Sequence, residues 1–170
     1  MERKLVILKE DLLNRRDKNK LLESEGNYLE SQVSYVIDIA INNIQILDTK
    51  TKEIKEYPCE DINCISLSMC SRYAGGTGRN GGIRTTINID VDVVLKDETL
   101  LFEIMDPHSF QKVIDFCDNN NIEIIDMIGV VDIYKQYPNQ EKREKYLEIN
   151  FNKLAKKYRL EHPRFKSRFQ

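Results

Sequence analysis

The sequence predicts an α+β fold: an antiparallel β-meander or open barrel, capped by a helix, with helical extensions at the N- and C-terminal ends. Apolar and polar residues alternate through most of residues 33–104, which is the pattern of strands with one buried face. Short polar segments separate the alternating runs, as expected of tight turns. Apolar residues repeat at helical spacing after residue 106, which indicates that a helix follows the strands.

Length and composition are those of a globular chain. The 170 residues suit one folded body with appended elements, and 41% of them are hydrophobic while 32% are charged. The longest aliphatic run near the start, Leu5–Leu8, is too short for a signal peptide or a membrane span. We therefore expect a cytoplasmic protein with an N-terminal extension (1–30), a β-rich domain (31–130) and a basic C-terminal helix and tail (131–170).

The N-terminal extension is expected to be helical. Leu5, Leu8 and Leu12 repeat at helical spacing within the highly charged residues 2–24. The run Lys4–Leu8 also fits a short strand, so the sequence leaves this alternative open.

Six strands are expected next. The clearest covers residues 87–95, where apolar residues, mostly β-branched, alternate with Asn and Asp and suit a pleated surface. The other five are shorter or less regular, and polar turns separate most of them. The six predicted strands span residues 33–41, 44–47, 53–57, 62–71, 87–95 and 100–104.

Two helices are expected after the strands. Asp106–Pro107 predicts a helix start, with Asp as the N-cap and Pro at the first helical position. Asn119–Asn121 ends this helix, and the apolar run 122–128 predicts one more strand. The second helix opens at Pro138. The predicted buried faces are Phe110, Val113, Ile114 and Cys117 on the first helix, and Leu147, Phe151, Leu154 and Tyr158 on the second.

The chemistry-bearing residues do not form a recognisable catalytic or metal-binding set. The four cysteines include no C-x-x-C pair, so we interpret them as reduced, small apolar fillers. A nucleophilic pair of Cys117 with His108 lacks a residue to orient the base. Asp90 and Asp92 share one face of a strand, which we interpret as solvent-exposed. We therefore expect no catalytic residue, metal or cofactor.

A glycine-rich segment is the most unusual feature of the chain. Residues 76–81 match G-x-G-x-x-G, but a strand follows instead of the helix that a dinucleotide site requires. A kinase-type loop is excluded because the chain has neither H-R-D nor D-F-G. Two interpretations are left: a flexible hairpin between strands, or a loop that binds a partner or an anion. In the second, the contact residues are Arg72, Thr77, Arg79, Asn80 and Arg84.

Charge is distributed unevenly along the chain. Residues 31–140 carry nine Lys/Arg and seventeen Asp/Glu, whereas residues 141–170 carry ten Lys/Arg and four Asp/Glu. The basic end fits contacts with nucleic acid, since cations neutralise phosphates and the interleaved aromatics can stack on bases. It equally fits a tail that lies on its own acidic body. The candidate nucleic-acid contacts are Lys153, Lys156, Lys157, Arg159, Arg164, Lys166 and Arg168.

The order of the predicted elements between residues 33 and 118 resembles a pleckstrin-homology-like domain. The resemblance lies in the run of strands followed by the helix that opens at Asp106–Pro107, and it covers about half of the chain. It departs from the family in having six strands before the helix instead of seven. The resemblance implies an open barrel that binds lipids, peptides or proteins. The family's basic lipid-binding loop would fall at Asn42–Asn43, which carries no cation.

These observations favour a non-enzymatic binding module of the adaptor or inhibitor type, with a protein partner. Nucleic-acid binding through the basic C-terminal helix and tail is a second hypothesis. Binding of a small anion or nucleotide at the Gly/Arg hairpin is a third.

Overall fold

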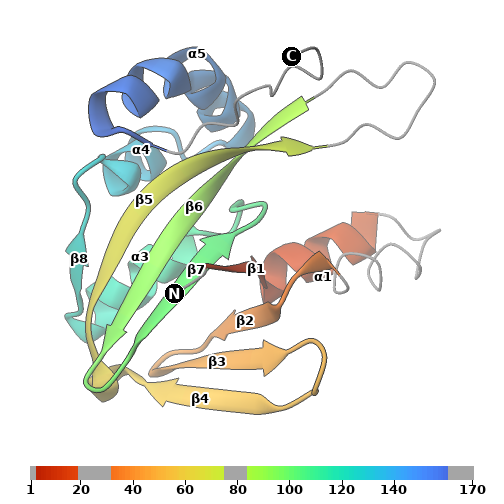
Figure 1. Cartoon of the computed structure of the whole chain (residues 1–170), viewed down its shortest axis with the longest axis vertical. Helices are drawn as coiled ribbons and strands as arrows, with labels where there is room; N and C mark the ends of the chain where they lie inside the picture. The colour runs from red at the N-terminus through yellow and green to blue at the C-terminus, as the bar shows by residue number, and fades with distance from the viewer. Residues whose placement is uncertain (1–2, 19–31, 75–83, 161–170) are drawn as a thin grey trace, which may run out of the picture.

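The structure, a computed structural model, describes residues 3–18, 32–74 and 84–160 (Figure 1). Eight strands form one mixed sheet in the order β4-β3-β2-β1-β7-β6-β5-β8, so β4 and β8 are its two edges and the sheet does not close. Four α-helices lie in the described residues. The predicted α+β class is therefore confirmed. No helix in these ranges is long and apolar enough to cross a membrane.

Two antiparallel meanders make up most of the sheet. The first consists of β2 (Tyr35–Ile39), β3 (Asn43–Asp48) and β4 (Ile54–Pro58). The second consists of β5 (Ile62–Ala74), β6 (Arg84–Leu95) and β7 (Thr99–Ile104), of which β5 and β6 are the longest strands. All six strands lie where alternation predicts them, with ends that differ by a few residues.

The strand β1 (Lys4–Leu8) joins the two meanders, because it pairs in parallel with β2 on one side and with β7 on the other. The helix expected across residues 2–24 is therefore wrong for residues 4–8, where the alternative of a strand holds. Helix α1 (Lys9–Lys18) begins only after it. The sheet is mixed and not one antiparallel meander, since β8 (Glu123–Ile125) also pairs in parallel, with β5.

Burial on both faces explains why β1 is hard to distinguish from a helix in the sequence. Val6 and Leu8 pack into the main hydrophobic core, whereas Ile7 packs with Leu12 of α1 on the opposite face. Side chains alternate across a strand, so a strand covered on both faces needs apolar residues at every position. The contiguous run Leu5–Leu8 meets that need. Because the run is unbroken, its pattern of apolar residues does not distinguish a strand from a helix.

The main core lies between the sheet, including β1 and parts of both meanders, and helices α3 (Gln111–Asn120), α4 (Val130–Gln136) and α5 (Gln140–Tyr158). The predicted buried face of α3 is confirmed for all four residues, and Asn121 ends the helix in a left-handed conformation. In the predicted stripe of α5, Leu147 and Phe151 are buried while Leu154 and Tyr158 are partly buried. Helix α4 is not predicted from the sequence, and β8 is shorter than the expected 122–128.

The turn before α3 differs from its prediction. Asp106 has a φ of 59° and α3 begins at Gln111, so Asp106 is not its N-cap. The backbone N–H and the hydroxyl of Ser109 instead donate hydrogen bonds to Oδ1 of Asp11, at 2.9 and 2.6 Å. A residue of α1 therefore holds the turn 106–110, a long-range contact that a local capping rule does not detect.

We predict that Ile7→Ala lowers the free energy of unfolding by about 2–5 kcal/mol, because it removes buried methyl groups from a strand packed on both faces. Ile54→Ala on the edge strand β4 is the matched control, since Ile54 is 62% exposed and should change stability by less than about 0.5 kcal/mol. Urea denaturation followed by circular dichroism measures both. Equal effects of the two substitutions would contradict the central position of β1.

Candidate functional site

A cavity of about 710 Å³ opens at the end of the sheet where β5 ends and β6 begins. Helices α4 and α5 lie beside this end of the two strands (Figure 1). The cavity is lined by residues of β1 and β5–β7, of the turn after β7 and of the two helices. Its apolar lining includes Leu5, Ile87, Met105 and Leu147, and its charged lining includes Arg72, Glu103, Asp106, His108, Arg143, Glu144 and Glu148.

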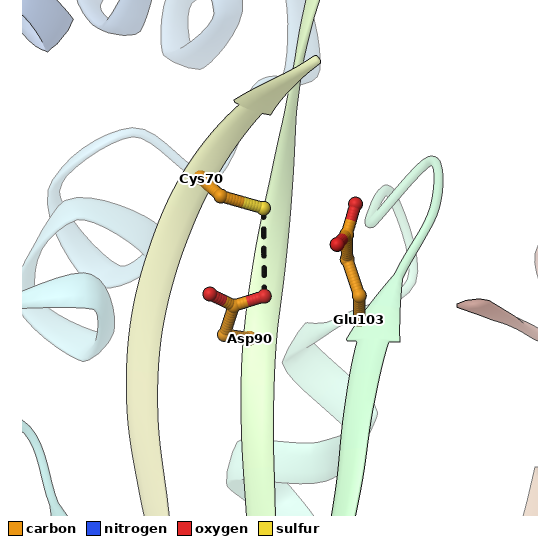
Figure 2. Close-up of side chains that lie close together, drawn as sticks. All are labelled: Cys70, Asp90 and Glu103. Carbon is orange, nitrogen blue, oxygen red and sulfur yellow. Dashed lines mark hydrogen bonds between the residues drawn. The ribbon is translucent and has the colours of Figure 1, made fainter. Parts of the chain in front are cut away.

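A buried polar cluster lies next to the cavity and crosses three strands. Figure 2 shows Cys70 of β5, Asp90 of β6 and Glu103 of β7, whose sulfur and carboxylate oxygens lie within 4.8 Å of one another. Asp90 and Glu103 are register partners, and the Cys70 thiol donates a hydrogen bond of 3.4 Å to Oδ1 of Asp90. The expectation that Asp90 lies on a solvent-exposed face is wrong, because it is buried.

The alternation of β6 explains how polar residues gather there. Ile89, Val91 and Val93 enter the main core, so Asn88 and Asp90 occupy the opposite face. The period-two pattern of the sequence identified this polar face. Its burial depends on neighbouring strands and on Arg3, which a pattern within one strand does not reveal.

Each of the two carboxylates already has a guanidinium beside it. Arg72 donates from Nε to both oxygens of Glu103, at 2.9 and 3.1 Å, and from a terminal nitrogen as well. Asn88 donates to the same carboxylate at 2.7 Å, and the Arg3 guanidinium lies 3.8 Å from Asp90. A metal ion would have to displace these donors, so the donor set fits a closed structural cluster.

The protonation states of the cluster follow from the same contacts. Burial opposes ionisation of Glu103, but the hydrogen bonds from Arg72 and Asn88 outweigh it and lower its pKa. Burial raises the pKa of Asp90 despite the nearby Arg3. Burial, reinforced by the charges of Asp90 and Glu103, raises the pKa of the Cys70 thiol well above its ordinary value. Cys70 is therefore a protonated thiol, which is a weak nucleophile and a poor metal ligand.

The turn 106–110 contributes His108 to the cavity. Its Nε2 pairs with Oδ1 of Asp106, and its Nδ1 lies 3.7 Å from Oε1 of Glu144 on α5. The bond to Asp106 raises the pKa of His108 against the opposing effect of burial. The pair of His108 with Cys117 is not formed, because Cys117 lies in the core and burial raises the pKa of its thiol to about 12.

Tyr134 of α4 and Arg143 of α5 contact each other, and Tyr134 also bonds to the turn 106–110. The Arg143 guanidinium lies 4.1 Å from the centre of the Tyr134 ring and donates to the carbonyls of Tyr137 and Pro138, at 3.0 and 3.4 Å. The Tyr134 hydroxyl donates to the carbonyl of Pro107 at 2.6 Å. Sequence analysis missed both residues, since a single Arg on a charged helix carries no sign that it is buried.

The residues predicted for the Gly/Arg hairpin fall in different places. Arg72 lines the cavity and is bound to Glu103. Arg84 begins β6, opposite Ala74 of β5. Thr77, Arg79 and Asn80 lie outside the described residues.

The residues predicted for nucleic-acid contact lie at the end of α5 or beyond it. Lys153, Lys156 and Lys157 are exposed on the helix, and the exposed Arg159 ends it. The remaining three, Arg164, Lys166 and Arg168, lie outside the described residues. None of the four described residues among these lines the cavity, so they belong to a surface separate from it.

No protein-family model, curated protein or solved structure significantly matches this chain. The candidate site therefore has to be interpreted from its own geometry.

Asp11 links the stability of the site to pH. This residue is 2% exposed, and its Oδ2 has no hydrogen-bond partner among the residues that the structure describes. Burial raises its pKa from 3.8 to about 6, despite the bonds that it accepts from Ser109. A carboxyl with a raised pKa stabilises the fold at low pH, and this contribution is lost as the pH rises through the folded-state pKa.

We predict that Asp11→Asn removes this pH dependence. The free energy of unfolding of the wild type should fall by about 2–3 kcal/mol relative to the variant between about pH 4 and pH 7, a difference that corresponds to the raised pKa. Chemical denaturation at a series of pH values measures the difference. Parallel pH profiles of the two proteins would show that Asp11 does not titrate in this range.

Proposed function

We propose that this protein is a non-enzymatic binding module that recognises another protein. The proposed contact surface is the 710 Å³ cavity together with the hairpin between β5 and β6. The observation that carries the proposal is a roomy cavity whose buried ionisable groups are already bound to one another. Such a cavity offers shape and charge for recognition while its reactive groups are occupied.

The state of three side chains supports recognition over chemistry. A catalytic acid, base or nucleophile needs a suitable pKa and must reach its substrate. Cys70 is buried and protonated, the Glu103 carboxylate accepts bonds from Arg72 and Asn88, and both ring nitrogens of His108 lie near carboxylates of this protein, Asp106 and Glu144.

The pleckstrin-homology-like resemblance belongs to this proposal. Two antiparallel meanders followed by α3 agree with the order of elements on which the resemblance rests. The parallel strand β1 and the helices α4 and α5 depart from it. The turn between β2 and β3 carries Ile41 and Asn42 and no cation, which favours a peptide or protein ligand over a phosphoinositide.

The strands that line the cavity lead directly into the glycine-rich segment, so we include that segment in the proposed contact surface. Arg72 and Thr86 are register partners that line the cavity, and the two strands continue only to Ala74 and Arg84. A partner seated in the cavity is therefore within a few residues of the glycine-rich segment. The anion alternative receives less support, because Arg72 is bound through two of its nitrogens to Glu103.

The nucleic-acid alternative stays a prediction. The exposed Lys153, Lys156 and Lys157 on α5 are compatible with it, and they are also typical of a solvated helix face.

We predict that Thr86→Trp abolishes partner capture. Thr86 is exposed and lines the cavity, so an indole at this position should obstruct its mouth without disturbing the core. Thr51→Trp is the matched control, because Thr51 is exposed in the turn between β3 and β4, on the other half of the sheet. Affinity capture from the cells that produce the protein, quantified by mass spectrometry, should recover a partner with the wild type and Thr51→Trp only.

A shortened hairpin tests the second half of the surface. Because Ala74 and Arg84 are register partners, Asn-Gly in place of residues 75–83 closes the strands with a two-residue turn. The shortened protein should keep its thermal unfolding profile and lose partner capture. Capture that survives both Thr86→Trp and the shortened hairpin would contradict the proposed surface.

A further inference from the structure

We propose that the cavity accepts a cationic side chain, a lysine or arginine of the partner, with its hydrocarbon stem against the apolar lining. This inference rests on the proposed function and names the chemistry of the ligand. It follows from which hydrogen-bonding groups of the cavity are occupied and which are left.

The cationic groups that line the cavity are bound to acceptors of this protein. Arg72 is bound to Glu103, and His108 pairs with Asp106 and lies near Glu144. Arg143 is buried against the Tyr134 ring and donates to two backbone carbonyls. An incoming anion would have to compete with these partners.

Acceptors, in contrast, are left over. Glu144 and Glu148 lie one turn apart on α5, both are exposed, and both line the cavity. Oε1 of Glu144 accepts from Gln140 at 2.9 Å and lies 3.7 Å from Nδ1 of His108, which leaves its second oxygen. Glu148 has no hydrogen bond or ion pair to any residue that the structure describes. Two like charges at this spacing repel each other, and a cation between them relieves the repulsion.

Asn88 supplies an independent sign of the same chemistry. It is 2% exposed, it lines the cavity, and its amide nitrogen donates to Glu103 at 2.7 Å. Its Oδ1 has no partner among the described residues. A buried acceptor without a donor is unfavourable, so this oxygen favours a ligand that brings N–H groups. Lysine and arginine carry three and five such donors and no acceptor in their charged groups.

The apolar lining suits the stem of such a side chain. Leu5, Ile87 and Met105 are partly buried cavity residues, and Leu147 is buried. Lysine and arginine bury their methylene groups along apolar surfaces while the charged end reaches polar groups. The carboxylates of Glu144 and Glu148 attract a cation toward the cavity before contact, and salt weakens this attraction.

Three short peptides that differ in one residue test the inference. Acetyl-Gly-Lys-Gly-amide, the norleucine peptide and the glutamate peptide are titrated into the isotope-labelled full chain, up to about 20 mM, a range suited to weak binding. We expect the lysine peptide to shift amide signals of α5 and of the start of β6 in a salt-dependent manner. The norleucine peptide has a similar stem without the charge and should bind several-fold more weakly.

Variants locate the binding. The double variant Glu144→Gln and Glu148→Gln should lower the affinity for the lysine peptide by roughly three- to tenfold, as expected for the loss of two exposed ion pairs. Glu141→Gln is the matched control, since Glu141 is exposed on the same helix and does not line the cavity. Thr86→Trp should prevent the shifts.

Each contrary result overturns the inference in a recognisable way. Equal binding of the norleucine peptide, or tighter binding of the glutamate peptide, excludes a cationic ligand while leaving the cavity as a binding site. If the shifts persist in Thr86→Trp, the lysine peptide binds outside the cavity. If the lysine peptide causes no shifts at the highest concentration, the cavity does not bind a cationic side chain. The proposed function is decided separately, by the partner-capture experiment with Thr86→Trp and Thr51→Trp.

Discussion

The strand β1 is the element on which the rest of this structure depends. Its parallel pairing with β2 and β7 turns two antiparallel meanders into one sheet, and it leaves neither meander with an open inner edge. Its side chains enter apolar clusters on both faces, so burial of Val6, Ile7 and Leu8 stabilises both halves of the molecule. A sheet divided at this point would expose apolar surface on each half.

The position of β1 also sets the geometry of the candidate site. Arg3 immediately precedes the strand and reaches Asp90 and Asp92 of β6, while Leu5 within it lines the cavity. On the next element, Asp11 holds the turn that carries His108. The polar cluster and the cavity are therefore assembled from both ends of the described chain, and the charges within the cluster neutralise one another. This arrangement is the physical reason why we propose that the site binds a partner and does not catalyse a reaction.

Sequence patterns predicted the elements whose environment is local. The alternation in residues 87–95 and the apolar face from Phe110 to Cys117 each describe one buried side, and both are confirmed. The strand β1 is ambiguous because burial on two faces removes the period, and leucines at positions 5, 8 and 12 imitate a helix. Of the cavity, only Arg72 was a predicted contact residue. Asp90, Glu103 and Arg143 owe their burial to partners on other elements, and a single sequence does not reveal such partners.

Native-state hydrogen exchange of the β1 amides tests the central claim most directly. If β1 joins the two meanders, the amides of Val6 to Leu8 exchange only through global unfolding, with a free energy within about 1 kcal/mol of that of β6 and β7. A much lower free energy of exchange in β1, with β6 and β7 still protected, would mean that the strand opens by itself. The sheet would then not depend on β1, and the account of both the fold and the site would be contradicted.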